Sequence, residues 1–314
     1  MERAAELWPD LAYPQWRDTA LTLQLWTQIV GKIRLALTPW VNHSWQVPLY
    51  VSARGLATGP IPTADKHIIE LEFDFHLHQL LVRTSRGEEA RIDLPGKSVA
   101  EFYRATLDAL RLMGVTVTIN EMPNEMPDPV RFSDDSVHAS YDRAAAQNFW
   151  RALLQADRLF KLFRSGFLGK VSPVHFFWGS FDLAVTRFSG RTAPPHPGGV
   201  PHLPDAVARE AYSHEVSSAG FWPGSDAVPR AAFYSYAYPE PPGYRTQRVT
   251  PGASFEPSIG EFILPYDTVR GASDPDALLL DFLATTYAAA ADCGRWDRAA
   301  LECAMGEPGK VRPV

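Results

Sequence analysis

The sequence contains few cysteines and no apolar stretch long enough to cross a membrane. Its two cysteines, Cys293 and Cys303, form no CxxC pair, so we expect two reduced thiols instead of a disulfide or a redox motif. The most apolar stretch, residues 277–291, is interrupted by Asp281 and falls short of the ~18 apolar residues that a spanning helix needs. The first residues, MERAAELWPDL, lack the apolar core of a signal peptide. We therefore expect a soluble, cytoplasmic protein without a membrane segment.

A surplus of basic charge is also missing. The 30 Lys and Arg residues are outnumbered by 36 Asp and Glu residues, which gives a net charge of −6. Nucleic-acid-binding proteins carry basic surfaces that neutralise phosphates, so we expect no nucleic-acid partner. With 314 residues, 46% of them hydrophobic, the chain has the composition of a globular protein of one large or about two ordinary domains.

Common catalytic and cofactor-binding motifs are absent. The sequence contains no GxGxxG and no GxSxG, and His214-Glu215 is followed by Val-Ser-Ser instead of completing a zinc-binding HExxH motif. The Gly96-Lys97-Ser98 triplet lacks the earlier glycine of a phosphate-binding loop and fits a turn before a capped helix. The sequence therefore identifies no cofactor, and we predict no structural metal.

The first part of the chain predicts a helix, four strands and a second helix. Apolar residues recur every three or four positions over 19–37, as in a helix that Pro39 ends. Residues 67–75 alternate apolar and acidic side chains, which is typical of a strand with one buried face. Ser98 and Glu101 form a capping box that opens the second helix. The predicted helices cover 19–37 and 98–113, and the predicted strands cover 47–55, 67–75, 79–84 and 89–94, with a further strand over 115–119.

A second series with the same order follows a linker. Residues 120–137 are rich in proline and acidic side chains and are typical of a linker, so we divide the chain into a first half, a second half and a tail. These are residues 1–119, 138–300 and 301–314. In the second half we predict helices over 140–163 and 273–294 and strands over 175–189, 232–238, 253–258 and 261–266.

The repeated order predicts an internal duplication. The dipeptide Gly-Lys occurs at 31–32 and at 169–170, and Arg54 and Arg187, 133 residues apart, end similar strand sequences. The fold class that follows is α+β, with two repeated α-β4-α halves whose antiparallel sheets carry their helices on one side.

An insertion lengthens the second half. The closing helices align with an offset of 180 residues, whereas the arginines align with an offset of 133, so the second half holds 47 additional residues. Most of the excess falls in residues 191–230, which are rich in Pro, Gly and His. Long irregular connections in compact domains are usually lids or binding loops, so we expect this inserted loop to cover a pocket.

Three segments of the chain resemble a known protein family. They are LWTQIVGKIRLALTPWVNHSWQVPLYVSARGLATGPIP at 25–62, HFFWGSFDLAVTRFSGR at 175–191 and SHEVSSAGFWPG at 213–224. Together they resemble the N-terminal and C-terminal signatures of domain of unknown function family 5996. The family is uncharacterised, so the resemblance implies no activity, substrate, cofactor or catalytic residue.

Histidines in and beside the inserted loop are candidates for acid–base or metal chemistry. A short helix in the loop would place Glu210 and His214 on one face, where His202 or His175 could complete a divalent-metal site. Without a metal, His214 with Glu215, or His175, would act as the catalytic acid and base. The alternative is that these loop side chains are solvated and have no chemical role.

Two arginines are candidates for binding an anion. Arg54 and Arg187 would occupy equivalent places in the two halves, and two converging guanidinium groups could hold a carboxylate or phosphate. The alternative is that they form structural ion pairs with Asp182, Glu70 or Glu72.

Aromatic side chains around the inserted loop are candidates for the walls of a pocket. Trp222 lies in the segment Gly220-Phe-Trp-Pro-Gly224, and Tyr234 and Tyr236 alternate along a strand that also carries Phe233. Trp178 shares a strand with Asp182. Core packing is the alternative for Phe233 and for one face of the tyrosines.

The leading hypothesis is an enzyme that acts on a small anionic organic molecule. Its pocket would lie at the junction of the two halves, under residues 191–230, between the strand with His175 and Arg187 and the strand with Tyr234. The first alternative is a non-catalytic small-molecule or partner-binding module, and the second is a metal-dependent hydrolase. The sequence indicates neither the reaction nor the oligomeric state.

Overall fold

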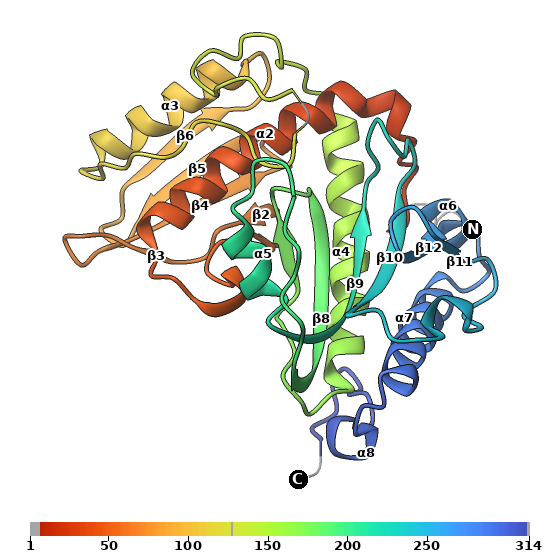
Figure 1. The fold of residues 1–314 in the computed structure, drawn as a ribbon. Coiled ribbons are helices and arrows are strands. Elements are labelled where there is room, and N and C mark those ends of the chain that lie inside the picture. Colours follow the sequence, from red (N-terminus) through yellow and green to blue (C-terminus); the bar gives the residue numbers. More distant parts are fainter. Residues whose placement is uncertain (1–6, 127, 313–314) are drawn as a thin grey trace.

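The computed structural model describes residues 7–126 and 128–312, and its architecture is α+β, with two antiparallel sheets of six strands each (Figure 1). The helices are α2 (Tyr13–Leu37), α3 (Val99–Leu112), α4 (Arg143–Ser165), α5 (Asp205–Ala211), α6 (Tyr266–Arg270), α7 (Pro275–Cys293) and α8 (Arg298–Leu301), with short 3₁₀ turns η1 (Asn42–Ser44) and η2 (Tyr244–Thr246). The first sheet contains β1 (Tyr50–Val51), β2 (Gly55–Ala57), β3 (Ile61–Pro62), β4 (Ile68–Asp74), β5 (Gln79–Thr84) and β6 (Glu89–Asp93). The second contains β7 (His175–Phe177), β8 (Asp182–Thr192), β9 (His214–Trp222), β10 (Ala232–Tyr238), β11 (Ser254–Glu256) and β12 (Glu261–Pro265).

The first sheet buries one face against helices of the same half. Its strands run in the order β1-β2-β4-β5-β6, and β3 pairs with β4. The apolar side chains that alternate along β4 are buried, among them Phe73. Phe102 of α3 lies between Phe73 and Trp26 of α2, with ring centroids 6.0 and 5.0 Å away. The predicted capping box is present, since Ser98 accepts a hydrogen bond from the Glu101 amide and the Glu101 carboxylate accepts one from the Ser98 amide.

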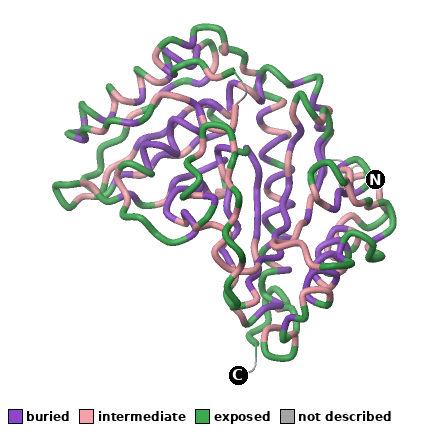
Figure 2. Tube along the Cα trace, viewed as in Figure 1, coloured by how far each residue is buried: buried purple, intermediate pink, exposed green. Residues whose placement is uncertain are grey.

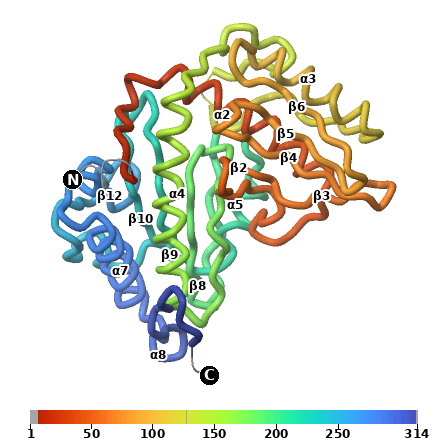
Figure 3. Tube along the Cα trace, turned by 180° about the vertical axis from the view of Figure 1, so that it is seen from behind, coloured from red at the N-terminus to blue at the C-terminus, as the bar shows by residue number. Residues whose placement is uncertain are grey.

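The second sheet is covered on one face by α4 and α7 (Figure 3). Its strands run in the order β7-β8-β9-β10-β12-β11, so consecutive strands are neighbours except β10 and β11, between which β12 lies. The predicted apolar stripe of α4, with Phe149, Leu153 and Phe160, is buried. Phe221 of β9 and Phe233 of β10 point to this same helical side, with ring centroids 5.2 Å apart.

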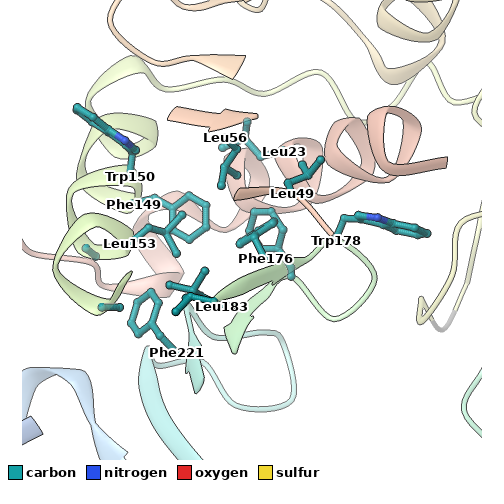
Figure 4. Packing of buried hydrophobic residues seen from close by; sticks show 14 of the residues in the cluster. Leu23, Leu49, Leu56, Phe149, Trp150, Leu153, Phe176, Trp178, Leu183 and Phe221 are labelled. Carbon is teal, nitrogen blue, oxygen red and sulfur yellow. The ribbon is translucent and has the colours of Figure 1, made fainter. Parts of the chain in front are cut away.

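The two halves share one hydrophobic core. Leu49, just before β1, exchanges two backbone hydrogen bonds of 2.9 and 2.8 Å with Phe176 of β7, which joins the sheets edge to edge. Figure 4 shows Leu49 and Leu23 of the first half packed with Phe149 and Phe176 of the second. Buried residues concentrate on the central strands and α4 (Figure 2). The hydrophobic core therefore continues across the junction of the two halves.

The order of the elements and the positions of the two Gly-Lys pairs bear on the proposed repeat. Each half runs through a long helix, antiparallel strands and a closing helix. Residues 31–32 lie inside α2, however, whereas residues 169–170 follow the end of α4. The Gly-Lys pairs therefore do not mark equivalent positions, and the duplication stays a prediction.

Several predicted boundaries differ from the structure. The strand expected over 175–189 is a hairpin, because the chain turns between β7 and β8 with Phe181 at a positive φ of 59°. The inserted loop expected over 191–230 contains β9, a central strand of the second sheet. The sequence did not predict this strand because the small residues of SHEVSSAGFW give it little apolar alternation. The strand expected over 115–119 is absent, and these residues form irregular chain.

The described helices include none that is both long enough and apolar enough to cross a membrane. Cys293 and Cys303 are free thiols, as predicted.

Candidate functional site

A cleft of about 1200 Å³ lies on the face of the second sheet opposite α4. Its floor is formed by β8, β9, β10 and β12. It is covered by residues 193–213, which include α5 and which we call the roof; Figure 1 shows α5 at the edge of the second sheet that lies next to the first half. The first half contributes walls from the start of α2 and from residues 40–47, and residues 124–126 close one side.

Strand alternation explains which side chains face the cleft. Along β8, Asp182, Ala184, Thr186 and Phe188 line the cleft, while Leu183 and Val185 between them are buried on the helical side. The neighbouring strands follow the same rule and contribute Val216, Ser218, Trp222, Ala232, Tyr234, Tyr236, Glu261 and Ile263. The sheet therefore has one face built for packing and one face that combines polar and aromatic groups.

A tyrosine and an aspartate meet across an intervening strand. Tyr234 of β10 donates a hydrogen bond to Asp182 of β8, although β9 lies between the two strands. Gly220 of β9 pairs with Ala184 on one side and with Tyr234 on the other, and a Cβ on Gly220 would overlap the Tyr234 ring. The missing side chain lets the ring lie flat across β9 and reach Asp182. Ser180 donates a second hydrogen bond to the Asp182 carboxylate.

Three carboxyl groups with raised pKa values line the cleft. Asp182 is joined by Glu125, from the segment between the halves, and by Glu261, the first residue of β12. Burial, and secondarily the charge of Asp182, raises the pKa of Glu125 and that of Glu261 to about 7. Burial also raises the pKa of Asp182, although hydrogen bonds from Ser180 and Tyr234 act in the opposite direction.

The cleft contains little positive charge to balance these acids. Among the described residues that line it, Arg17 is the one Arg or Lys, and its guanidinium pairs with Asp226 at 2.5 Å. No basic group is among the causes that shift the pKa values of Asp182, Glu125 and Glu261. The three carboxyls therefore sit in a desolvated site without a cation from the described part of the chain.

Aromatic side chains form much of the remaining lining. The hydroxyls of Tyr212, at the end of α5, and Tyr236, on the floor, lie 2.8 Å apart and connect the roof to the sheet. Burial raises the pKa of Tyr212 to about 12. The Trp178 indole lies against Gly31 of α2 and donates to the Val47 carbonyl at 3.0 Å.

Comparison with known proteins gives one match. A family model described as "Family of unknown function (DUF5996)" matches residues 8–303. The chain belongs to this family. Searches of curated proteins and of solved structures found no match. The three segments that resemble the family's signatures, residues 25–62, 175–191 and 213–224, all contribute lining residues to the cleft.

The structure brings together five of the residues that the sequence suggested for ligand binding. They are Trp178, Asp182, Trp222, Tyr234 and Tyr236, and all of them line the cleft.

The two candidate arginines lie elsewhere and do not converge. Arg54 forms an ion pair with the buried Asp74 in the first half. Arg187 points to the helical side of β8, donates to the Phe163 carbonyl and packs over the Phe163 and Tyr287 rings. Burial lowers the pKa of Arg187 to about 10. Arg54 therefore forms a structural ion pair, which was the alternative to anion binding, although its partner is Asp74. The prediction that the two arginines converge is wrong.

The candidate acid–base histidines are also outside the cleft lining. His175 is buried among the rings of Trp45, Tyr50 and Phe177, and neither of its ring nitrogens has a hydrogen-bond partner among the described residues. Burial lowers the pKa of His175 to about 3, so its imidazole is uncharged at neutral pH.

His214 and Glu215 do not form the expected pair. Adjacent residues of a strand point to opposite faces, and here the Glu215 carboxylate lies 2.6 Å from Arg191 while His214 Nδ1 lies 3.0 Å from Ser213 Oγ.

The residues considered for a metal do not converge. α5 ends at Ala211, so Glu210 and His214 do not share a helical face, and Glu210 accepts a hydrogen bond of 2.9 Å from Trp40. Within residues 7–126 and 128–312, no group of three or more His, Cys, Asp or Glu side chains is placed to hold a metal ion.

Glu125 and Glu261, the acids that sequence reasoning missed, carry only weak signals in the sequence. Glu125 lies in the acidic, proline-rich stretch NEMPNEMP that predicted a linker, and its role depends on a tertiary contact. Glu261 is an isolated acid at the start of an otherwise apolar strand, FILP. A charge at such a position is costly unless it has a function or a partner. This cost is the signal by which the sequence could have indicated Glu261 as a site residue.

Proposed function

We propose that the protein binds a small organic molecule in this cleft and acts on it by acid–base chemistry. The observation that carries the proposal is the group of three desolvated carboxyls, Asp182, Glu125 and Glu261, in a cleft lined by aromatic rings. Groups with shifted pKa values in a large cleft are typical of active sites.

The carboxyls differ in their hydrogen bonds and can exchange protons with a ligand. Asp182 accepts hydrogen bonds from Ser180 and Tyr234, which oppose the rise that burial causes in its pKa. Glu125 and Glu261, with pKa values of about 7, hold a proton that they can give up near neutrality. Carboxyls that titrate near neutrality in a cleft are groups that general acid–base catalysis can use.

The charge of the cleft favours an uncharged or positively charged molecule. Arg17 already pairs with Asp226, and Arg54 and Arg187 lie outside the lining, so an anion would meet the carboxyls of the cleft without an unpaired arginine to offset the repulsion. Aromatic faces such as those of Trp222 and Tyr236 suit either an apolar surface or a cation. The proposal therefore keeps the small-molecule ligand expected from the sequence, but the ligand is uncharged or cationic instead of anionic.

A charge-matched set of fragments tests the proposal. Small amines, their uncharged analogues and carboxylates of equal size are compared by thermal shift, and hits are incubated with the protein and analysed by mass spectrometry for turnover. We expect binding of amines or uncharged fragments, weaker binding by Trp222→Ala, and loss of turnover in Asp182→Asn. Asp93→Asn, which alters an exposed carboxyl of β6, is the matched control.

Each outcome separates the hypotheses. Preferential binding of carboxylates would contradict the proposed charge of the ligand. Binding without turnover of any fragment would favour a non-catalytic binding module.

A further inference from the structure

Glu125 reaches the cleft from a segment that is held on two sides. The buried Gln28 of α2 exchanges two hydrogen bonds with the Asn124 backbone, of 2.9 and 2.7 Å. On the other side, the Glu125 amide donates to the Pro201 carbonyl of the roof at 3.1 Å, and the Asn124 side chain donates to the His202 carbonyl at 2.5 Å. The segment is thus fixed between the first half and the roof.

The backbone of Glu125 is itself in an uncommon conformation. Its φ is +58°, in the left-handed region that residues with a Cβ rarely adopt. Such conformations persist where the surrounding structure imposes them. The hydrogen bonds of Asn124 and Glu125 supply that constraint, so the direction in which the Glu125 side chain leaves the segment is set.

The Glu125 carboxyl rests on the backbone of Gly179, in the turn between β7 and β8. A Cβ on Gly179 would overlap Oε1 of Glu125 and would lie 3.0 Å from its Cδ, and the three atoms nearest to that Cβ all belong to Glu125. The φ of Gly179 is not in the left-handed region, so the turn itself does not require glycine. The glycine leaves room for the carboxyl, one residue before Ser180 and three before Asp182.

We propose that Gly179 is a positioning residue that fixes the Glu125 carboxyl against the β7–β8 turn, in the cleft that Asp182 also lines. This inference rests on the proposed function, because it makes Glu125 a proton donor of the cleft whose place depends on the contact between the segment and the β7–β8 turn. A side chain at position 179 would push the carboxyl out of its desolvated place and toward water.

The test measures the titration of the Glu125 carboxyl and needs no ligand. Protein labelled with ¹³C at the glutamate carboxyls is titrated by NMR, and the Glu125 signal is assigned by its loss in Glu125→Gln. Gly179→Ala is compared with Gly306→Ala, whose added methyl would have its nearest contact at 3.4 Å, from Ser165.

We expect the Glu125 carboxyl of the unaltered protein to titrate with a pKa of about 7. In Gly179→Ala its pKa should fall toward the ordinary glutamate value of about 4.3, whereas Gly306→Ala should leave it unchanged. The charge of Asp182 also acts on Glu125, and Asp182 is not altered. Equal titration in the unaltered protein and in Gly179→Ala would overturn the proposal.

Folding of the variant is part of the test. Because the overlapping atoms all belong to Glu125, a Gly179→Ala protein that fails to fold should be rescued by Glu125→Ala in the same chain. A double variant that still fails to fold would also overturn the proposal. Failure of the proposed function is a separate result, since a Glu125 titration that depends on Gly179 would stand even if no fragment were bound or turned over.

Discussion

Neutralising Glu261 should stabilise the protein at alkaline pH. The Glu261→Gln change keeps the size of the side chain and removes its charge. Burial raises the folded-state pKa of Glu261 to about 7, from an ordinary value of 4.5. Each pKa unit corresponds to about 1.4 kcal/mol, so the ionised group should cost the folded state up to about 3 kcal/mol above pH 7.

The pH dependence follows from the direction of this shift. Between about pH 4.5 and pH 7 the folded protein holds a proton on Glu261 that the unfolded chain has released, so the free energy of unfolding falls as the pH rises. Below this window both states are protonated, and Glu261→Gln should match the unaltered protein. Above it the variant should be the more stable.

Urea unfolding at about pH 5 and about pH 8 measures the effect. Glu89→Gln is the matched control, because Glu89 likewise begins a strand but is ion-paired with Arg83 and Arg91 at the surface. That control should gain no stability at the higher pH. A Glu261→Gln protein that is no more stable than the unaltered one at pH 8 would refute the account of a desolvated carboxyl.

Three further variants test other parts of the structure. Gly220→Ala should destabilise the protein by about 1–3 kcal/mol in thermal unfolding, because the new methyl overlaps the Tyr234 ring; an unchanged melting temperature would argue against that packing. Arg187→Met should lower the melting temperature, through the loss of its hydrogen bond and ring contacts, and leave fragment binding in the cleft unchanged; weakened binding at equal stability would return Arg187 to the site. Lys32→Met should speed proteolysis of the linker, since the Lys32 amino group binds the carbonyls of Asn120 and Met122; an equal cleavage rate would contradict this anchoring.

Local patterns in the sequence predicted the helices and the strands with clear alternation. The capping box at Ser98 and the apolar stripe of α4 are encoded by residues a few positions apart, so they can be read without tertiary information. β9 was missed because Ser217, Ser218 and Gly220 give it little apolar alternation. Its place in the centre of the sheet is set by contacts with β8 and β10.

The candidate site was only partly predictable for the same reason. Trp222 and Tyr234 stood out as aromatics at unusual positions, and they line the cleft. Glu125 gave no such signal, because its burial comes from the roof and from the turn at Gly179, which are distant in sequence. Arg187 was assigned to the site because the proposed duplication made it the counterpart of Arg54, whereas in β8 it lies on the face opposite Asp182.

The central claim is that the acid-lined cleft holds the ligand, and a crystal structure with a bound fragment tests it most directly. The fragment is taken from the set that stabilises the unaltered protein and fails to stabilise Trp222→Ala. The account predicts density over the floor of the second sheet, with a polar atom of an uncharged or cationic fragment within hydrogen-bond distance of the Asp182 carboxyl. Density at Arg54 or on the helical side near Arg187, with the cleft empty, would contradict it.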